Sequence, residues 1–269
     1  MLISFSGAVK VAVIISKYEA DQNIAVHLRS LFGGDSFRNI SVHSVDKESP
    51  FCDDIDKEID ADLFVFATKH QSESGRPSLT CHAPGNWNKA EFGGKEKMLC
   101  VAPAFYLKKF FLELKKYEEK VNAEITLEAT HHGPLLETPC MFVEIGSSLK
   151  EWVNPEYGRI IAECIMNVFT EEQVNVKPCF FIGGGHYNQS ADKSMVSEYA
   201  VGHICPKYAL EHLNKEMILQ AVNKTLPKAQ LVLLDWKGMG KEKERIIKLL
   251  DVMKIRYERS NLKSVPAKA

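Results

Sequence analysis

Short apolar runs alternate with segments of helical period along most of the chain. The runs are rich in Val, Ile, Leu and Phe, and most are followed by a polar loop and then by apolar positions three and four residues apart. Predicted strands cover residues 11–16, 63–67, 98–103, 125–129, 140–147, 179–185, 201–205 and 231–235. Predicted helices cover residues 25–32, 104–120, 155–169 and 241–253. This alternation is typical of βα units around a mostly parallel sheet.

The chain shows no low-complexity linker and no internal repeat between these segments. We therefore expect one α/β domain over residues 1–269. The polar stretch around 68–97 could form a small irregular subdomain within it. The run at 63–67 is apolar without interruption, which is typical of a central strand buried on both faces. The apolar opening at 1–16 is too short to cross a membrane, so we interpret it as a first strand rather than a signal peptide.

Charge and cysteine content narrow the class of protein. Lys and Arg number 34 against 35 Asp and Glu, and the formal net charge is -1. Without a global basic field we expect no DNA partner, and any contact with RNA must be a local patch. The seven cysteines form no CxxC pair. Scattered cysteines in odd number favour reduced thiols in a cytoplasmic protein that has no membrane partner.

Polar residues follow three of the predicted strands. His70 comes after the strand at 63–67, and His186 directly follows the glycine-rich end of the strand at 179–185. Asp235 is the last residue of the strand at 231–235. The carboxyl ends of parallel strands meet at one edge, where ligands bind, so we expect these side chains there. Six of the nine histidines lie at strand ends or beside Gly or Pro: His70, His82, His131, His132, His186 and His203. This distribution predicts a functional cluster.

The triple glycine Gly183, Gly184 and Gly185 matches neither the GxGxxG nor the GxxxxGK[ST] spacing. A loop that cradles a nucleotide phosphate is therefore disfavoured. Two interpretations stay open: the backbone approaches a ligand closely with His186 at its end, or the glycines make a tight turn.

Period-two alternation makes a prediction for Glu144. In a strand over 140–147, Met141, Val143 and Ile145 share one face, and Glu144 lies on the other. If the strand is central, the carboxylate is buried and must be paired or bound to a metal. The alternative is an edge strand with Glu144 in water.

The same alternation applies to ITLEATHH at 125–132. It places Glu128 and His132 on one face and His131 on the opposite face. Imidazoles that face different directions can do different work, one as metal ligand or acid–base group and one as an orienting partner. The chain has no HExxH helix motif, so any zinc site must be assembled from scattered strand ends.

Five motifs together resemble the archaeal and plant type of D-aminoacyl-tRNA deacylase. They are ATKHQSESGRPSLTCHAPGNW (67–87), ITLEATHHGP (125–134), PCMFVEIGSS (139–148), IGGGHY (182–187) and GHICPKY (202–208). The resemblance implies hydrolysis of the ester between a D-amino acid and the acceptor end of tRNA, zinc dependence and a monomer. It also implies a three-layer α/β/α fold with a mostly parallel mixed sheet, similar to phosphorylase/peptidyl-tRNA-hydrolase-like proteins.

The resemblance carries eight residues over as site candidates, and their chemistry suggests roles. Candidate metal ligands are His70, His82, His131, His186 and His203. Candidate catalytic groups are Glu128, His132 and Glu144, with either glutamate as the general base. Candidate substrate contacts are basic and glycine residues of the same loops: Lys69, Arg76, Gly183, Gly184, Gly185, Lys207 and Lys237.

Some positions depart from the family pattern. Asn188, Gln189 and Ser190 stand where Ala-Pro-Arg is expected, so a basic residue that would meet phosphate is missing. Cys81 and Cys205 stand where apolar residues are expected, and we interpret them as small buried side chains rather than zinc ligands. Two other functions remain compatible with the residues: a metal-dependent hydrolase of small molecules or peptides, and a tRNA-binding module without catalytic activity.

Overall fold

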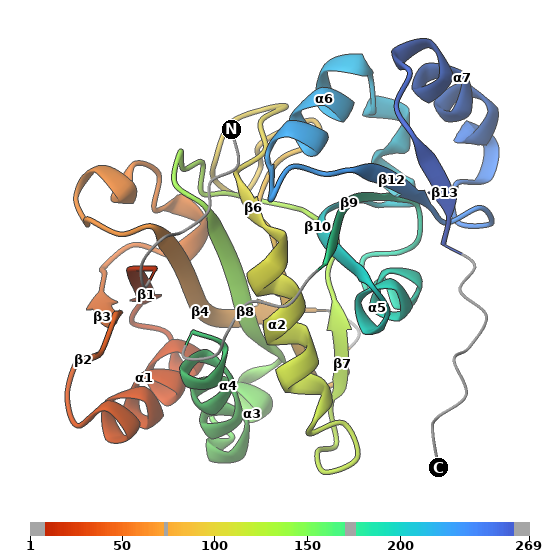
Figure 1. The fold of residues 1–269 in the computed structure, drawn as a ribbon. Coiled ribbons are helices and arrows are strands. Elements are labelled where there is room, and N and C mark those ends of the chain that lie inside the picture. Colours follow the sequence, from red (N-terminus) through yellow and green to blue (C-terminus); the bar gives the residue numbers. More distant parts are fainter. Residues whose placement is uncertain (1–8, 73–74, 170–175, 261–269) are drawn as a thin grey trace.

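The computed structural model describes residues 9–72, 75–169 and 176–260, and Figure 1 shows its fold. Residues 1–8 of the apolar opening lie outside this part of the chain. Its strands form two main sheets and a two-stranded ribbon. We expected the predicted strands in a single sheet, and that expectation is wrong because the strands at 177–182, 199–205 and 231–234 pair with one another instead.

The larger sheet has seven strands in the order β2-β3-β1-β4-β8-β5-β7. These are β1 (Val11–Ile15), β2 (Ser36–Phe37), β3 (Ile40–Ser44), β4 (Leu63–Gln71), β5 (Ser78–His82), β7 (Glu124–Leu127) and β8 (Cys140–Ser147). Four of its six neighbouring pairs are parallel, whereas β2 runs antiparallel to β3 and β5 antiparallel to β8. The sheet is therefore mixed and mostly parallel, as predicted.

Four helices lie in the same part of the chain as these strands. They are α1 (Glu19–Phe32), α2 (Ala104–Lys115), α3 (Leu149–Trp152) and α4 (Pro155–Val168). Apolar residues of α1, α2 and α4 join those of one sheet face in the largest hydrophobic core. The predicted helix at 25–32 begins earlier, at Glu19, because its polar first turn hides the helical period.

We expected a second layer of helices on the opposite face of the larger sheet. That expectation is wrong, because short 3-10 helices and a loop cover this face. Phe64, Phe66 and Phe142 pack there against Ile55 and Leu136. The covering segments include the short 3-10 helices η1 (Ser49–Phe51) and η2 (Ile55–Lys57) and a loop. This irregular cover leaves room for side chains of the sheet to line a cavity.

The smaller sheet is parallel throughout, in the order β10-β9-β12-β13. Its strands are β9 (Lys177–Ile182), β10 (Tyr199–Cys205), β12 (Leu231–Leu234) and β13 (Tyr257–Arg259). Residues of α6 (Lys215–Asn223) and α7 (Lys243–Met253) pack on one face, and α5 (Gln189–Val196) packs on the other with α2. Figure 1 shows α2 between the two sheets, where one hydrophobic core joins them.

Two predicted segments differ in their extent. The predicted strand at 98–103 is reduced to β6 (Ala102–Pro103), which pairs with β11 (Thr225–Leu226). In the region 68–97, which we expected to be irregular, β4 continues to Gln71 and β5 follows. Two further 3-10 helices, η3 (Lys207–His212) and η4 (Gly240–Glu242), border the smaller sheet.

All seven cysteines are buried free thiols, which agrees with the prediction of reduced cysteines. Among the helices described here, none combines the length and apolar character required to span a membrane.

Candidate active site

Glu144 lies in the middle of β8, which is a central strand. Its neighbours in register are Thr68 of β4 and Thr80 of β5. Met141 and Val143 point into the main core, and Glu144 lies on the opposite face with 2% of its surface exposed. The predicted alternation is confirmed, and the edge-strand alternative is wrong because both sides of β8 are paired.

Two histidines stabilise the buried Glu144 carboxylate. Its Oε2 lies 3.5 Å from His70 Nδ1 and 3.5 Å from His82 Nε2. For both His70 and Glu144, burial and the neighbouring opposite charges shift the pKa in opposite directions. Burial lowers the pKa of His70, but the carboxylates of Glu128 and Glu144 outweigh it and raise that pKa to about 9. Burial raises the pKa of Glu144, but the nearby imidazoles of His70 and His82 hold it well below its usual range.

Three histidines lie close to the carboxylate of Glu128. Its Oε2 lies 3.1 Å from His186 Nε2, 3.2 Å from His70 Nδ1 and 3.7 Å from His131 Nε2. Burial and the nearby Glu144 would raise the pKa of Glu128, but His70 and His186 overcome them and lower it. Glu128 is therefore an ionised carboxylate that orients imidazoles from three different segments.

The backbone around Glu128 connects the two sheets. Strand β7 ends at Leu127, and the Glu128 N–H donates to the Cys81 carbonyl of the larger sheet. The Ala129 N–H then donates to the His186 carbonyl at 2.8 Å. The Thr130 N–H donates to the Ile204 carbonyl of the smaller sheet at 3.0 Å. These bonds bring His186, which follows β9, to the edge of the larger sheet.

The predicted opposition of His131 and His132 is wrong. Their ring centroids lie 4.1 Å apart, and each lies close to His82, at 4.4 Å and 5.0 Å. Alternation fails because regular strand geometry ends at Leu127 and His132 has a φ of 44°, in the left-handed region. Both imidazoles therefore enter the same cluster.

Protonation separates the histidines into two kinds. Burial, reinforced by the other histidines, lowers the pKa of His131 well below its usual value. Burial also lowers the pKa of His132, to about 4. Both are therefore neutral near pH 7, whereas His70 between its two carboxylates is charged.

The structure does not bring His203 into the cluster. Its ring is fully buried, with Nδ1 3.2 Å from Thr130 Oγ1 and Nε2 3.0 Å from the Cys100 carbonyl oxygen. Both ring nitrogens thus have partners within the protein, so the expectation that His203 serves as a metal ligand is not supported. The position beside Gly202, which suggested a site, lies inside β10 and is buried in the core.

The triple glycine makes a tight turn. Gly183 and Gly184 have φ of 108° and 83°, and a Cβ on Gly184 would lie 2.5 Å from Asn188 Nδ2. That amide donates to the Gly183 carbonyl, and Asn188 Oδ1 caps α5 by accepting from Ala191 N–H. Asn188 therefore has a structural role at the position that departs from the family pattern, and Gly183, Gly184 and Gly185 do not line either cavity described below.

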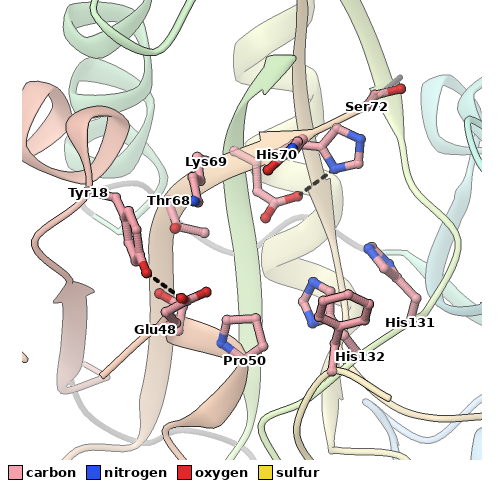
Figure 2. A pocket seen from close by; sticks show the side chains of 13 residues that line it. Tyr18, Glu48, Pro50, Thr68, Lys69, His70, Ser72, His131 and His132 are labelled. Atoms are coloured by element: carbon pink, nitrogen blue, oxygen red, sulfur yellow. Dashed lines mark hydrogen bonds and ion pairs between the residues drawn. The ribbon is translucent and has the colours of Figure 1, made fainter. Parts of the chain in front are cut away.

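A cavity of about 500 Å³ opens beside the cluster, and Figure 2 shows its wall. We call it the β4 cavity, because residues 68–72 contribute to it. The other lining residues are Tyr18, Glu48, Ser49, Pro50, Phe92, His131, His132 and Glu144. Glu144 and His70 therefore border this cavity, whereas Glu128 is not part of its wall. Sequence reasoning missed Tyr18 and Glu48, since neither lies in a motif or at a predicted strand end.

A second cavity, of about 360 Å³, lies against the same two histidines. We call it the Trp87 cavity. Its lining residues are Gly85, Asn86, Trp87, Asn88, Lys89, Glu91, Phe92, Thr130, His131, His132, Tyr208, Ala209 and His212. His131, His132 and Phe92 thus belong to both cavities.

The cluster could hold a metal ion in three overlapping ways. Within the described residues, ligand atoms come within 4.8 Å of one another in three groups. They are His70, Glu128, His131 and His186; His82, His131 and His132; and His82, Glu128 and Glu144. His82 Nε2, Glu128 Oε1 and Glu144 Oε2 are buried and have no hydrogen-bond partner in the part of the chain that the structure describes, which is the environment that a bound cation satisfies. The mixed imidazole and carboxylate donors fit zinc.

A known protein family matches most of the chain. The family model described as D-aminoacyl-tRNA deacylase matches residues 57–258. The chain belongs to the D-aminoacyl-tRNA deacylase family. Every residue of the His/Glu cluster lies within the matched range.

Individual relatives cover most of the chain. The D-aminoacyl-tRNA deacylase of Pyrococcus furiosus is 38% identical over 220 residues, which are 79% of this chain and 80% of that protein. The D-aminoacyl-tRNA deacylase of Methanocaldococcus jannaschii is 34% identical over 258 residues, which are 89% of this chain and 95% of that protein. The crystal structure of a conserved protein of unknown function matches with a TM-score of 0.87 and 28% identity, covering 95% of this chain and 96% of its own.

The basic rim expected for a deacylase acting on tRNA is only partly assembled around the cavities. Lys69 lines the β4 cavity, where its ammonium lies 3.8 Å from the centre of the Tyr18 ring. Arg76, Lys207 and Lys237 line neither cavity. Lys89, which the sequence did not single out, lines the Trp87 cavity.

Asp192 of α5 hydrogen-bonds to the end of β7, next to Glu128. We predict that ionisation of Asp192 makes the stability of the protein depend on pH. It accepts from the Leu127 N–H at 2.8 Å and from Thr126 Oγ1 at 2.7 Å. Burial raises its pKa from 3.8 to about 7, against the lowering effect of these bonds. Its contribution to stability is therefore complete below about pH 4 and is lost as pH rises through about 7.

Asp192→Asn should remove that part of the pH dependence. In urea unfolding between pH 4 and pH 8, the free energy of unfolding of the variant should fall less than that of the wild type. Asp46→Asn, at an exposed aspartate, is the control and should keep the wild-type slope. Equal slopes for the wild type and Asp192→Asn would contradict the prediction.

Proposed function

We propose that this chain hydrolyses the ester bond between a D-amino acid and the acceptor end of tRNA, releasing the free D-amino acid and free tRNA. The observation that carries the proposal is Glu144, a buried ionised carboxylate in the wall of a 500 Å³ cavity, in a member of the D-aminoacyl-tRNA deacylase family. The names of the relatives from Pyrococcus furiosus and Methanocaldococcus jannaschii support the same activity. The cytoplasmic location, the monomeric state and the finer likeness to phosphorylase/peptidyl-tRNA-hydrolase-like proteins stay predictions.

Glu144 is the group that we assign as general base. An aminoacyl ester is already activated, so hydrolysis requires a positioned water that loses a proton as it attacks the carbonyl carbon. Glu144 borders the β4 cavity, its lowered pKa keeps it ionised near pH 7, and its buried Oε2 has no hydrogen-bond partner among the described residues. A water beside Oε2 would therefore find a free acceptor. Glu128 is the less suitable base, because it lies behind the cavity wall.

His70 is the group that we assign to the developing oxyanion. Its pKa of about 9 keeps it protonated near pH 7, and it lines the same cavity as Glu144. A fixed positive charge in a buried site stabilises negative charge on the ester oxygen as the water attacks. Glu128, 3.2 Å from His70 Nδ1, positions the imidazolium and maintains its charge.

The zinc site that fits the geometry best is formed by His82, His131 and His132. In each ring Nδ1 lies near a backbone carbonyl oxygen, at distances of 3.2, 2.8 and 2.6 Å respectively. Such bonds fix the ring orientation and leave the three Nε2 atoms to face an ion. Three imidazoles with one open position are a common catalytic zinc set, and the bound ion would polarise a carbonyl and lower the pKa of water. This assignment moves His132 from the catalytic group to the ligands, and leaves His186 as a partner of Glu128.

One assay tests the proposal and its rivals together. D-tyrosyl-tRNA and L-tyrosyl-tRNA are incubated with the protein before and after treatment with a chelator, and the zinc content of each sample is measured. We expect hydrolysis of the D-ester with the L-ester spared. The treated protein should lose zinc and activity together, and both should return when zinc is added.

The other outcomes are equally informative. Binding of D-tyrosyl-tRNA with its ester intact would identify a tRNA-binding module and contradict the proposal. Equal, salt-insensitive turnover of free D-amino-acid esters would identify a hydrolase of small molecules, because contact with tRNA phosphates makes affinity fall steeply with salt. Full activity in protein shown to be free of zinc would contradict the metal assignment alone.

A further inference from the structure

The two cavities meet at His131 and His132. These histidines and Phe92 line both the β4 cavity and the Trp87 cavity, and the buried Glu128 and Glu144 lie within the same cluster. The reacting groups therefore stand between two separate spaces. A substrate with two bulky parts joined by the scissile bond would place one part in each space.

The substrate class of the proposed function has this form. An aminoacyl-tRNA joins an amino acid to a terminal nucleoside through one ester, and the inference that follows rests on that proposed function. Hydrolysis at the cluster requires both parts to be accommodated at once. The question is which cavity takes the nucleoside.

We propose that the Trp87 cavity binds the terminal adenosine of tRNA, with Phe92 and Tyr208 as stacking surfaces for the base, and that the β4 cavity receives the D-aminoacyl group. Phe92 is 65% exposed and Tyr208 is 59% exposed, and both border the Trp87 cavity. Large aromatic side chains exposed to this degree lose contact with water when a planar ligand covers them. Unpaired bases at the ends of RNA are recognised by stacking on such rings.

Polar groups in the Trp87 cavity suit the rest of a nucleotide. The Asn88 amide lies 3.3 Å from His212 Nε2, and both side chains border the cavity. Amide and imidazole groups can hydrogen-bond the edge of a base that is stacked beside them. Lys89 borders the same cavity and is placed to meet phosphate, which a cavity for an amino acid would not require.

The β4 cavity lacks a comparable stacking surface of its own. The ring of Tyr18 is covered by the Lys69 ammonium at 3.8 Å, and its hydroxyl donates to Glu48. The Glu48 carboxylate is instead suited to the α-ammonium group of an amino acid. The assignment of the two cavities therefore follows from their different chemistry.

Tyr208 also has a second contact, which the test must separate from stacking. Its hydroxyl lies 3.3 Å from His186 Nδ1, and His186 in turn contacts Glu128. Tyr208→Phe removes this contact and keeps the ring. Tyr208→Ala and Phe92→Ala remove the stacking surfaces.

The experiment measures competition by adenosine 5′-monophosphate during deacylation of D-tyrosyl-tRNA. In the wild type the nucleotide should raise the KM for D-tyrosyl-tRNA and leave kcat unchanged. In Tyr208→Ala and in Phe92→Ala, the inhibition constant of the nucleotide and the KM for tRNA should each rise by about tenfold, the order of magnitude for loss of one base–aromatic stack. Tyr208→Phe should keep the wild-type inhibition constant. Phe51→Ala is the control, because Phe51 is exposed at 44% and lines neither cavity.

Each outcome decides between the proposals. Deacylation by the wild type without competition by the nucleotide, or equal inhibition constants in all variants, would overturn the adenosine assignment and leave the proposed function intact. An equal loss in Tyr208→Phe and Tyr208→Ala would show that Tyr208 acts through His186, which also overturns it as a stacking surface. Absence of deacylation by the wild type would overturn the proposed function itself, and binding of the nucleotide would then be measured directly by calorimetry with the same variants.

Discussion

Glu144→Gln should lower kcat for D-aminoacyl-tRNA by about 10²- to 10⁴-fold, the range of general acid–base catalysis, and leave KM nearly unchanged. Glutamine has the shape of glutamate but cannot accept a proton from water near pH 7. The side chain would keep its place in the wall of the β4 cavity, next to His70 and His82. Substrate binding would persist because Glu144 acts mainly as the water attacks. The measurement is steady-state deacylation of D-tyrosyl-tRNA.

The control for this variant is Glu113→Gln. Glu113 is another buried glutamate, 6% exposed, on α2 and outside both cavities. It should keep the wild-type kcat, which would show that loss of a buried carboxylate alone does not impair the enzyme. Circular dichroism confirms the fold of both variants. A near-normal kcat in folded Glu144→Gln would remove Glu144 as the base and return Glu128 to consideration.

His70→Asn and Glu128→Gln should each lower kcat by about 10²-fold, and the double variant should be about as slow as the slower single one. The reason is that Glu128 lies behind the cavity wall and acts through His70, whose Nδ1 is 3.2 Å from its Oε2. Once His70 is absent, the carboxylate has no charged imidazole to position toward the ester. A double variant slower by the product of the two single effects would show that Glu128 has an independent role.

His27→Asn is the control for this pair. His27 lies on α1, within the helical layer and outside both cavities, so the variant should keep the wild-type rate. Zinc content is measured in all four proteins. If His70→Asn lost zinc, the ion would lie in the group with Glu128, His131 and His186. If only Glu128→Gln lost zinc, the ion would lie in the group with His82 and Glu144. Either result would show that the assignment to His82, His131 and His132 is wrong.

Local sequence patterns predicted the regular parts of the site correctly. The alternation in MFVEIGS placed Glu144 opposite Met141 and Val143, and β8 follows it because the strand is regular over Cys140–Ser147. The uninterrupted run at 63–67 predicted a strand buried on both faces, and β4 is one. Such predictions succeed because the two-residue period is a property of the extended backbone itself. Residues near in sequence are sufficient to establish it.

Local sequence patterns could not predict the irregular backbone or the contacts between distant segments. The alternation in ITLEATHH stopped being valid at Leu127, where the strand ends, so the placing of His131 and His132 together could not be predicted from it. The same limit applied to His203, because a histidine beside a glycine at a binding site and one buried in the core have the same local sequence pattern.

The motifs and the family resemblance were sufficient to predict the class of protein, and they supplied the residues of the candidate site. Tertiary structure alone decided how the site is assembled. Glu128 meets His186, 58 residues away, only because the chain after β7 hydrogen-bonds to the smaller sheet. The two cavities on either side of His131 and His132 likewise combine residues from Tyr18 to His212. The physical reason is that a strand's alternation depends on its own backbone, whereas contacts between distant segments depend on which sheets form and how their loops pack.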